Sequence, residues 1–300
     1  MIWEEAGAFA GAGKICIIFI MKRIKTVVLF YNSKRRRALA YSAAIERRLK
    51  SLGAKVFKIC VNDAACAVKA ADAVVAVGGD GTVLYAARHV IALGLPVLGI
   101  NAGGLGFLSG IEQKEFLKSA GVFLGGGFKK FKRSLLAVSV QRGGKNVFGP
   151  MPALNDCVIR SPEARAFTLR ASFGRQFLSE YFGDGLIVST PSGSTAYSLA
   201  ASGPIVLPDL EVFLLSPICP HTLTHRPIVL SAAEQLRVAV HGGHSGPQAL
   251  RLSMDGQETF SLESGDTVLV GRHPRSLELL APAGFSYFDV LRRKLSWGER

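Results

Sequence analysis

The first 130 residues alternate between short apolar runs and longer segments whose apolar residues recur at helical spacing. The apolar runs typical of strands occupy residues 26–31, 55–60, 74–77 and 96–100. Segments 38–52 and 82–93 have the helical pattern, and glycines Gly53 and Gly94 end them. Strands that alternate with helices in this way form a parallel sheet. Residues 21–127 are therefore predicted to form an α/β domain with a Rossmann-like sheet.

The pattern changes after residue 127 to short β-rich segments separated by turn-forming residues. These segments occupy residues 135–141, 153–159, 167–173, 185–189, 227–230, 236–241 and 267–271. One helix is expected in this part, and it begins near Ser194. Residues 128–283 are therefore predicted to form an all-β C-terminal domain.

Both ends of the chain differ from these two domains. Residues 8–20 are apolar but too short to span a bilayer, and the acidic Glu4 and Glu5 precede them, unlike the basic start of a signal peptide. We interpret residues 1–20 as an extension outside the fold. Residues 284–300 form a basic, amphipathic tail, whose Phe288, Leu291 and Leu295 share one helix face. This tail is predicted to dock back on the first domain.

The composition indicates the charge of the expected partner. The chain carries a formal charge of +14, and 49% of its residues are hydrophobic. This is a globular composition that favours phosphate-bearing partners, either a nucleotide or a nucleic acid. The five cysteines have no CxxC spacing, which argues against a disulfide framework or a zinc site. We expect reduced thiols and a cytoplasmic location.

The sequence Gly78-Gly-Asp-Gly-Thr82 follows a buried strand and opens a helix. Glycines allow a close approach of the backbone to a ligand, and a helix start offers free N–H groups to an anion. Asp80 is unexpected there because a carboxylate repels phosphate. It could hold a metal or accept a proton from a hydroxyl, or it could simply cap the helix. The loop at 101–108 starts at the same sheet edge, which favours a functional role.

The second domain contains three polar segments. Asn155-Asp156 begins an apolar strand and suits ribose hydroxyls, although an ordinary turn could also use these residues. Segment 183–197 is rich in Ser and Thr at the start of a helix, where hydroxyls cap the helix or bind a polar ligand. We interpret Asp255-Gly256 as a hairpin turn.

These motifs occur in the order found in NAD kinases, and the chain resembles that family over residues 24–298. The matching segments are Gly78–Thr82, Asn101–Leu108, Asn155-Asp156, Asp184–Tyr197, Pro217–Pro227, Asp255–Gln257 and Leu291–Trp297. The resemblance implies the NAD kinase / diacylglycerol kinase-like fold. It also implies transfer of phosphate from ATP, or from polyphosphate, to the 2′-hydroxyl of the adenosine ribose of NAD.

The resemblance further implies the roles of individual residues. Asp80 matches the proton acceptor, and Gly78, Gly79, Gly81 and Thr82 match the phosphate loop. The positions that would contact NAD are Asp80, Gly81, Phe107, Asn155, Asp156, Asp184, Ser192, Thr195, Ala196, Tyr197 and Gln257. Mg²⁺ or another divalent cation is implied, although no side chain is assigned to it. A homodimer or homotetramer is also implied, with the NAD site completed by a neighbouring subunit and with no nucleic-acid or membrane partner.

The chain departs from the family pattern at four positions. Ser192 replaces a common threonine and Ala200 a common serine, while Phe182 and Gly104 stand where basic residues are frequent. The basic run 34–37 could assist in neutralising the phosphates, but as a run of charged residues it is interpreted in the first place as a solvated surface. Two other functions stay open: a lipid kinase of the diacylglycerol kinase-like group, and a non-catalytic sensor of the dinucleotide.

Overall fold

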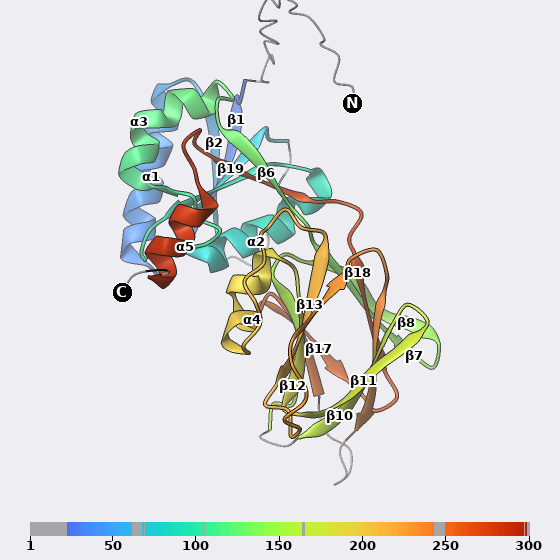
Figure 1. Cartoon of the computed structure of the whole chain (residues 1–300). Coiled ribbons are helices and arrows are strands. Elements are labelled where there is room, and N and C mark those ends of the chain that lie inside the picture. The colour runs from blue at the N-terminus through green and yellow to red at the C-terminus, as the bar shows by residue number, and fades with distance from the viewer. Residues whose placement is uncertain are drawn as a thin grey trace, which may run out of the picture.

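The computed structural model describes residues 23–61, 68, 70–104, 106–163, 166–242, 250–296 and 298. The predicted extension at residues 1–20 lies outside them. The described chain forms two units, a mixed sheet covered by helices and a β-rich unit beside it (Figure 1). The predicted fold class, α/β followed by all-β, is confirmed.

The first unit is built on a seven-stranded sheet in the order β2-β1-β3-β4-β19-β6, with β5 paired to β4. Its strands are β1 (Thr26–Tyr31), β2 (Lys55–Cys60), β3 (Ala73–Gly78), β4 (Val97–Asn101), β5 (Ile111–Glu112), β6 (Lys129–Arg133) and β19 (Leu277–Ala281). All pairs are parallel except β19 with β6. Every residue of β3 is buried, because helices cover both faces of the sheet.

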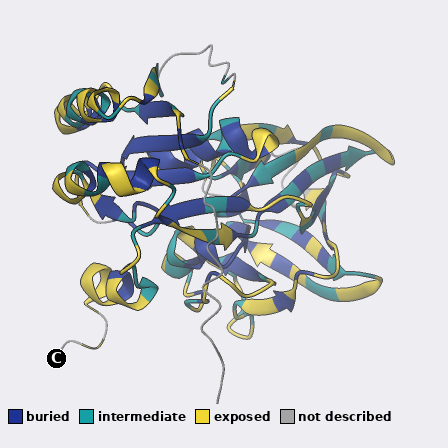
Figure 2. Cartoon of the chain, turned by 90° about the horizontal axis from the view of Figure 1, so that it is seen from above, coloured by how far each residue is buried: buried dark blue, intermediate teal, exposed yellow. Residues whose placement is uncertain are grey.

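Those helices are α1 (Arg36–Ser51), α2 (Asp80–Val90) and α3 (Gln113–Leu124). Ile45 of α1 and Phe116 of α3 pack in one cluster with Leu29, whereas Val83 of α2 packs in another cluster with Phe30. Leu29 and Phe30 are neighbours in a strand and therefore point to opposite faces. Figure 2 shows the resulting layers, with buried strands between helices that expose their outer sides.

Three elements of this unit differ from the sequence prediction. The helix expected at 82–93 begins at Asp80 and ends as a 3₁₀ turn, Ile91–Leu93, before the left-handed Gly94. α3 was not predicted. β6 and β19 lie beyond residue 127 in the sequence, so the first sheet contains strands from both predicted domains. The domain boundary at residue 127 stays a prediction.

The second unit consists of two antiparallel six-stranded sheets, β11-β10-β15-β18-β7-β8 and β14-β13-β12-β9-β16-β17. The strands are β7 (Leu136–Arg142), β8 (Lys145–Ala153), β9 (Asp156–Arg160), β10 (Phe167–Phe173), β11 (Gln176–Gly183), β12 (Gly185–Ser189), β13 (Val212–Ile218), β14 (Ile228–Ser231), β15 (Leu236–Gly242), β16 (Leu250–Met254), β17 (Glu258–Leu262) and β18 (Thr267–Arg272). Val138 and Leu169 from one sheet pack with Leu186 from the other in a single core.

The last element is α5 (Tyr287–Leu295), which begins after Ser286, whose hydroxyl accepts the Asp289 N–H at 3.3 Å. Its buried residues are Val290 and Leu291. Phe288 and Leu295, predicted to share the docked face with Leu291, are 47% and 36% exposed. Leu291 is thus buried as predicted, but the buried face extends from it to Val290 and not to Phe288 and Leu295.

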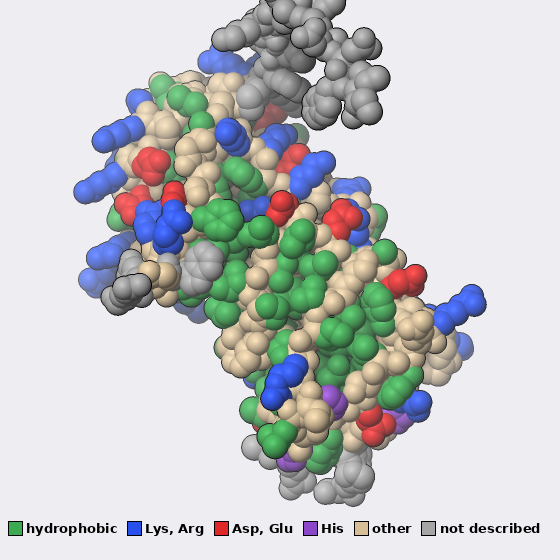
Figure 3. All heavy atoms as spheres, viewed as in Figure 1, with side chains coloured by type: hydrophobic (Ala, Val, Ile, Leu, Met, Phe, Trp, Pro, Cys, Tyr) green, Lys and Arg blue, Asp and Glu red, His purple; other side chains and the backbone are tan. Residues whose placement is uncertain are grey.

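The surface drawn in Figure 3 differs between the two units. Lys and Arg side chains gather over the helices of the first unit, whereas apolar side chains prevail over the β-rich unit. Large exposed apolar residues of the second unit include Leu207, Leu210 and Val229. The positive charge of the chain is therefore displayed beside the α/β sheet on this face.

Candidate functional site

The candidate site begins at the carboxyl ends of three parallel strands. Tyr31 of β1 pairs with Val77 of β3, and Gly78 of β3 pairs with Asn101 of β4. The chain segments that follow β1, β3 and β4 therefore leave the sheet at one edge. This is where open α/β sheets bind ligands.

The glycine turn between β3 and α2 is closely packed on itself. A Cβ at Gly78 would lie 2.2 Å from the Thr82 hydroxyl oxygen, so only glycine fits at that position. Gly79 is the N-cap of α2, and its carbonyl accepts the Thr82 N–H at 2.9 Å. The predicted phosphate loop is therefore a compact turn that ends in the first turn of a helix.

Asp80 holds this turn to the next loop of the site. Its carboxylate accepts the backbone N–H of Phe107 at 2.8 Å and that of Leu108 at 3.1 Å. A Cβ at Gly106 would lie 2.0 Å from an Asp80 carboxylate oxygen, so a glycine is required there. A carboxylate has about four acceptor positions, so the two backbone donors leave room for a ligand hydroxyl.

Phe107 is fixed from two sides. Its N–H binds Asp80, and Lys294 of α5 lies with its Nζ 5.8 Å from the centre of the Phe107 ring. The C-terminal helix therefore contacts a residue of the candidate site. The sequence predicted both Phe107 and the docked tail, but not that they meet.

The hydroxyl-rich segment folds into a 3₁₀ turn, Ser192–Thr195, followed by α4 (Tyr197–Ala200). The Thr190 hydroxyl donates to the Leu154 carbonyl at 2.6 Å. A Cβ at Gly193 would lie 2.0 Å from the Asn155 carbonyl oxygen. Part of this segment thus holds the Leu154–Asn155 backbone in place. The buried Ser192 hydroxyl has no hydrogen-bond partner among the described residues.

Asp255 does more than form a hairpin turn. It has the left-handed φ of 51° expected in such a turn. Its carboxylate also accepts the N–H groups of Leu154, Asn155 and Asp156, at 2.8, 2.7 and 3.2 Å. The Asp-Gly pair predicted the turn. It did not predict that the Asp255 carboxylate would accept hydrogen bonds from a loop 100 residues earlier in the chain.

The pKa values of the two acidic side chains that adjoin here, Asp156 and Asp255, are both raised. Burial raises the pKa of Asp156 to about 7, and the charge of Asp255 acts in the same direction. Burial also raises the pKa of Asp255, although its three backbone donors oppose the rise. Near neutral pH, Asp156 is therefore close to half protonated and can donate or accept a hydrogen bond.

Two cavities adjoin at the β16–β17 hairpin. One, of about 290 Å³, is lined by Asn155, Asp156, Val158, Arg160, Ala196, Tyr197, Ser253, Asp255 and Gly256. The other, of about 410 Å³, is lined by Asn32, Arg35, Val61, Gly79, Gly81, Thr82, Tyr85, Arg88 and Gln257. The Gln257 amide donates to the Gly81 carbonyl at 2.8 Å and so ties the hairpin to the glycine turn.

These cavities join most of the predicted site residues and add others. Gly79, Gly81, Thr82 and Gln257 share the larger cavity, and Asn155, Asp156, Ala196 and Tyr197 share the smaller one. Asn32, Tyr85 and Arg88, which also line the larger cavity, were not predicted from the sequence, and Arg35 was considered only as part of the basic run 34–37. The sequence signal for Asn32 and Arg35 is the polar turn that follows the first strand.

Asp184 is not brought to this place. It lies between β11 and β12, where the adjacent Gly185 pairs with Arg160. Asp156 pairs instead with Ser189, at the other end of β12. Four residues of strand separate the two ends by roughly 13 Å.

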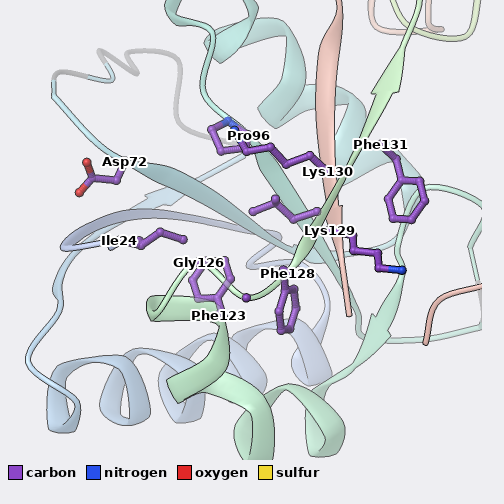
Figure 4. Close-up of a pocket in the computed structure, with 11 residues that line it drawn as sticks. Ile24, Asp72, Pro96, Phe123, Gly126, Phe128, Lys129, Lys130 and Phe131 are labelled. Carbon is purple, nitrogen blue, oxygen red and sulfur yellow. The ribbon is translucent and has the colours of Figure 1, made fainter. Parts of the chain in front are cut away.

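A larger cavity, of about 800 Å³, lies elsewhere and contains none of the predicted site residues (Figure 4). Ile24, Asp72 and Pro96, which line it, precede β1, β3 and β4 respectively. It therefore opens at the amino ends of the strands, opposite the glycine turn. The Asp72 carboxylate accepts the N–H groups of Lys25 and Thr26, at 2.9 Å each, which is a structural role.

A metal-binding cluster and a membrane-spanning helix are both absent from the described residues. Within them, no group of three or more His, Cys, Asp or Glu side chains could hold a metal ion. In the same part of the chain, no helix has the length and apolar character needed to cross a membrane.

Comparison with known proteins places these features in a family. Residues 15–128 match the model of the ATP-NAD kinase N-terminal domain, and residues 154–281 match that of the ATP-NAD kinase C-terminal domain. The chain is 44% identical over 228 residues to the NAD kinase of Symbiobacterium thermophilum, covering 75% of this chain and 78% of that protein. It is 42% identical over 231 residues to the NAD kinase of Geobacter metallireducens, covering 77% and 80% respectively.

Solved structures share the fold. Yeast NADH kinase complexed with NADH superimposes with a TM-score of 0.80 at 21% identity, over 93% of this chain and 89% of that chain. An NAD kinase from Archaeoglobus fulgidus in complex with ATP gives a TM-score of 0.68 at 24% identity, over 91% and 97%. At these identities, the likeness describes the fold.

Proposed function

Because this chain belongs to the NAD kinase family, we propose that it transfers the terminal phosphate of ATP to the 2′-hydroxyl of the adenosine ribose of NAD, giving NADP. The observation that carries the proposal is the pair of cavities on either side of the 255–257 turn. One contains the glycine turn and two arginines, which suit phosphates. The other contains an amide, a carboxyl group and an aromatic ring, which suit a nucleoside.

In the proposed reaction, the ribose oxygen bonds to the terminal phosphorus while the bond from that phosphorus to the bridging oxygen breaks, and ADP leaves. The hydroxyl proton passes to Asp80. A carboxylate is a much weaker base than the alkoxide of a ribose hydroxyl, so Asp80 accepts the proton late in the transfer, as the ribose oxygen bonds to phosphorus. Its two backbone donors fix the carboxylate in place for that step.

The dinucleotide is proposed to lie in the smaller cavity. Asn155 and Asp156 are placed to bind hydroxyl or amide groups there, and Tyr197, with 39% of its surface exposed, offers a ring face to a base. Gly81 and Gln257 would meet it from the larger cavity. Ser192, Thr195 and Ala196 belong to the turn that precedes Tyr197, and the unpartnered Ser192 hydroxyl is the member of this turn best suited to a ligand.

We propose that Mg²⁺ is carried on the phosphates of the donor. The described residues contain no cluster of three potential metal ligands, so they do not form a protein cage for it. When bound, the ion would neutralise charge on the phosphates. Assays with polyphosphate and with ATP in parallel would show which donor the site accepts.

Asp184 and the exposed apolar surface support a homo-oligomer, a dimer or a tetramer. Asp184 is about one strand length from Asp156 within the chain, so we propose that it contacts a dinucleotide bound mainly by a second copy. Leu207, Leu210 and Val229 are 39%, 48% and 46% exposed, as expected of an interface. Sedimentation of the purified chain would test this, because a monomer with full activity would contradict it.

The central test is incubation with NAD, ATP and Mg²⁺ followed by an assay for NADP. Stabilisation by NAD without turnover would favour a sensor instead, and phosphorylation of diacylglycerol would favour a lipid kinase. We also propose a cytoplasmic location, which the buried, non-disulfide thiols of Cys60 and Cys157 support. Cell fractionation would test it.

A further inference from the structure

We propose that Arg35 binds the phosphate chain of the donor, directly above the glycine turn. This inference rests on the proposed function, because it names a residue for the same reaction. Of the basic run 34–37, it assigns phosphate binding to Arg35 alone, since Arg35 lines the 410 Å³ cavity and the other three residues do not.

The fold explains why Arg35 alone of this run reaches the cavity. It follows β1, whose end lies beside the end of β3, and it is the extended N-cap residue of α1. All four residues of the run are exposed, but Lys34, Arg36 and Arg37 do not line the cavity. Arg35 is the last of the four residues between β1 and α1, and its guanidinium is directed toward the glycine turn.

The guanidinium of Arg35 spans the gap between two glycine loops. Its Nη1 lies 3.4 Å from the position that a Cβ would take at Gly79 and 3.9 Å from that at Gly103. The missing side chains at these two positions therefore bring a fixed positive charge against both backbones. Phosphates bound to the N–H groups of the turn would lie within reach of it.

Arg35 also differs from Arg88, the other arginine of this cavity. Arg88 forms an ion pair with Glu258 and lies over the Tyr85 ring, 5.4 Å from its centre. Arg35 forms no ion pair with any described residue, and the first turn of α1 contains no acidic residue. Of the two cations, Arg35 is the one whose charge is available to a ligand.

The chemistry of the side chain fits phosphate oxygens. A guanidinium presents several N–H donors in a plane and can bind two oxygens at once, which an ammonium cannot. A hydrogen bond to a charged group contributes about 1.5–3 kcal/mol, which corresponds to roughly 10- to 150-fold in an equilibrium constant. The larger effect should fall on the donor, because Arg35 lines the cavity assigned to the phosphates and does not line the cavity that holds Asn155, Asp156 and Tyr197.

The test compares Arg35→Gln with Arg37→Gln, a matched exposed arginine two residues later. We expect Arg35→Gln to raise the KM for ATP about 10- to 100-fold while the KM for NAD changes less than about twofold. Arg37→Gln should leave both constants unchanged, and Arg35→Lys should be intermediate because it keeps the charge but loses the fork. Equal KM values for ATP in the two glutamine variants would overturn the proposal, as would an equal rise in both KM values for Arg35→Gln.

Inorganic tripolyphosphate separates this inference from the proposed function. It should stabilise the unmodified chain and the Arg37→Gln variant against thermal unfolding, and it should stabilise Arg35→Gln much less. If the unmodified chain forms no NADP, the proposed reaction fails, yet this binding comparison still decides the role of Arg35. If NADP forms and tripolyphosphate binds all three chains equally, the reaction stands and the inference fails.

Discussion

The two halves of the candidate site are built in different ways. The phosphate half is local, because Gly78 to Thr82 are consecutive and Thr82 packs on Gly78. The dinucleotide half is assembled from distant segments, because Asp255 holds the backbone at 154–156 and Thr190 donates to Leu154. A local half depends on which residues occupy a short motif. A distant half depends on whether the whole β-rich unit has folded correctly.

Asp80 gives the largest expected effect and tests the chemistry of the local half. Asp80→Asn should lower kcat by about 10²- to 10⁴-fold while NAD binding persists, because the proton acceptor is lost. An asparagine offers one carbonyl oxygen where the carboxylate accepts two N–H groups, so the thermal stability of the variant must be measured alongside. Near-normal turnover would show that Asp80 is not the proton acceptor.

Asp255 is the corresponding test of the distant half. Asp255→Asn cannot accept all three backbone N–H groups, so we expect about 2–3 kcal/mol less stability in urea unfolding and a raised KM for NAD. Asp209→Asn serves as a control, since Asp209 is exposed and lines neither site cavity. If the Asp255 variant unfolded like the control, the loop at 154–156 would not depend on this carboxylate.

The pH dependence of stability tests the electrostatics of the distant half. The pKa of Asp156 is raised from 3.8 to about 7, so the fold favours the protonated form. Its stabilising contribution is full below pH 4 and is lost as the pH rises to 7, by at most roughly 4 kcal/mol.

Asp156→Asn should therefore be more stable than the unmodified chain at pH 8 and nearly equal to it at pH 4. Thermal unfolding of both chains across this range measures the difference. A gap that stayed constant with pH would show that Asp156 does not titrate in this window.

Gln257 sharpens the comparison because it links the two halves. The hydrogen bond from its side-chain amide to the Gly81 carbonyl is partly exposed and should contribute about 0.5–1.5 kcal/mol to the stability of the fold. Gln257→Ala should raise the KM values for NAD and ATP by a few fold each and should lower the stability of the fold by no more than this amount. A change confined to one substrate would mean that the residue serves one cavity and not the link.

Deletion of residues 1–20, the proposed extension outside the fold, has the smallest expected effect. Turnover and the unfolding midpoint should both match those of the full chain. A loss of either property would show that the segment is not an extension outside the fold. The match to the family model begins at residue 15, within this segment.

The contrast between the halves also explains which features could be predicted from the sequence. The βαβ pattern and the Gly78–Thr82 turn arise from neighbouring residues, so apolar periodicity and glycine spacing were sufficient. The partners of Asp255 lie 99 to 101 residues away, and no local pattern encodes that reach. In the sequence, Arg35 could not be distinguished from its basic neighbours. Its place at the cavity depends on the register of β1 against β3, which only the structure reveals. β19 was missed since a five-residue apolar run does not reveal which sheet it joins.

The crossing of the chain between the two units has a consequence for synthesis. β6 ends at Arg133 and its partner β19 begins at Leu277, so the β-rich unit is an insertion within the first sheet. At 5–20 residues per second, a ribosome needs about 7 to 30 s to make the roughly 140 residues between these strands. During that time the edge of β4 is paired only at Ile100 and Asn101, where β5 lies beside it. Ribosome-bound chains that stop before residue 277 should accordingly be cleaved by protease around β4 and β6, whereas chains that include β19 should resist.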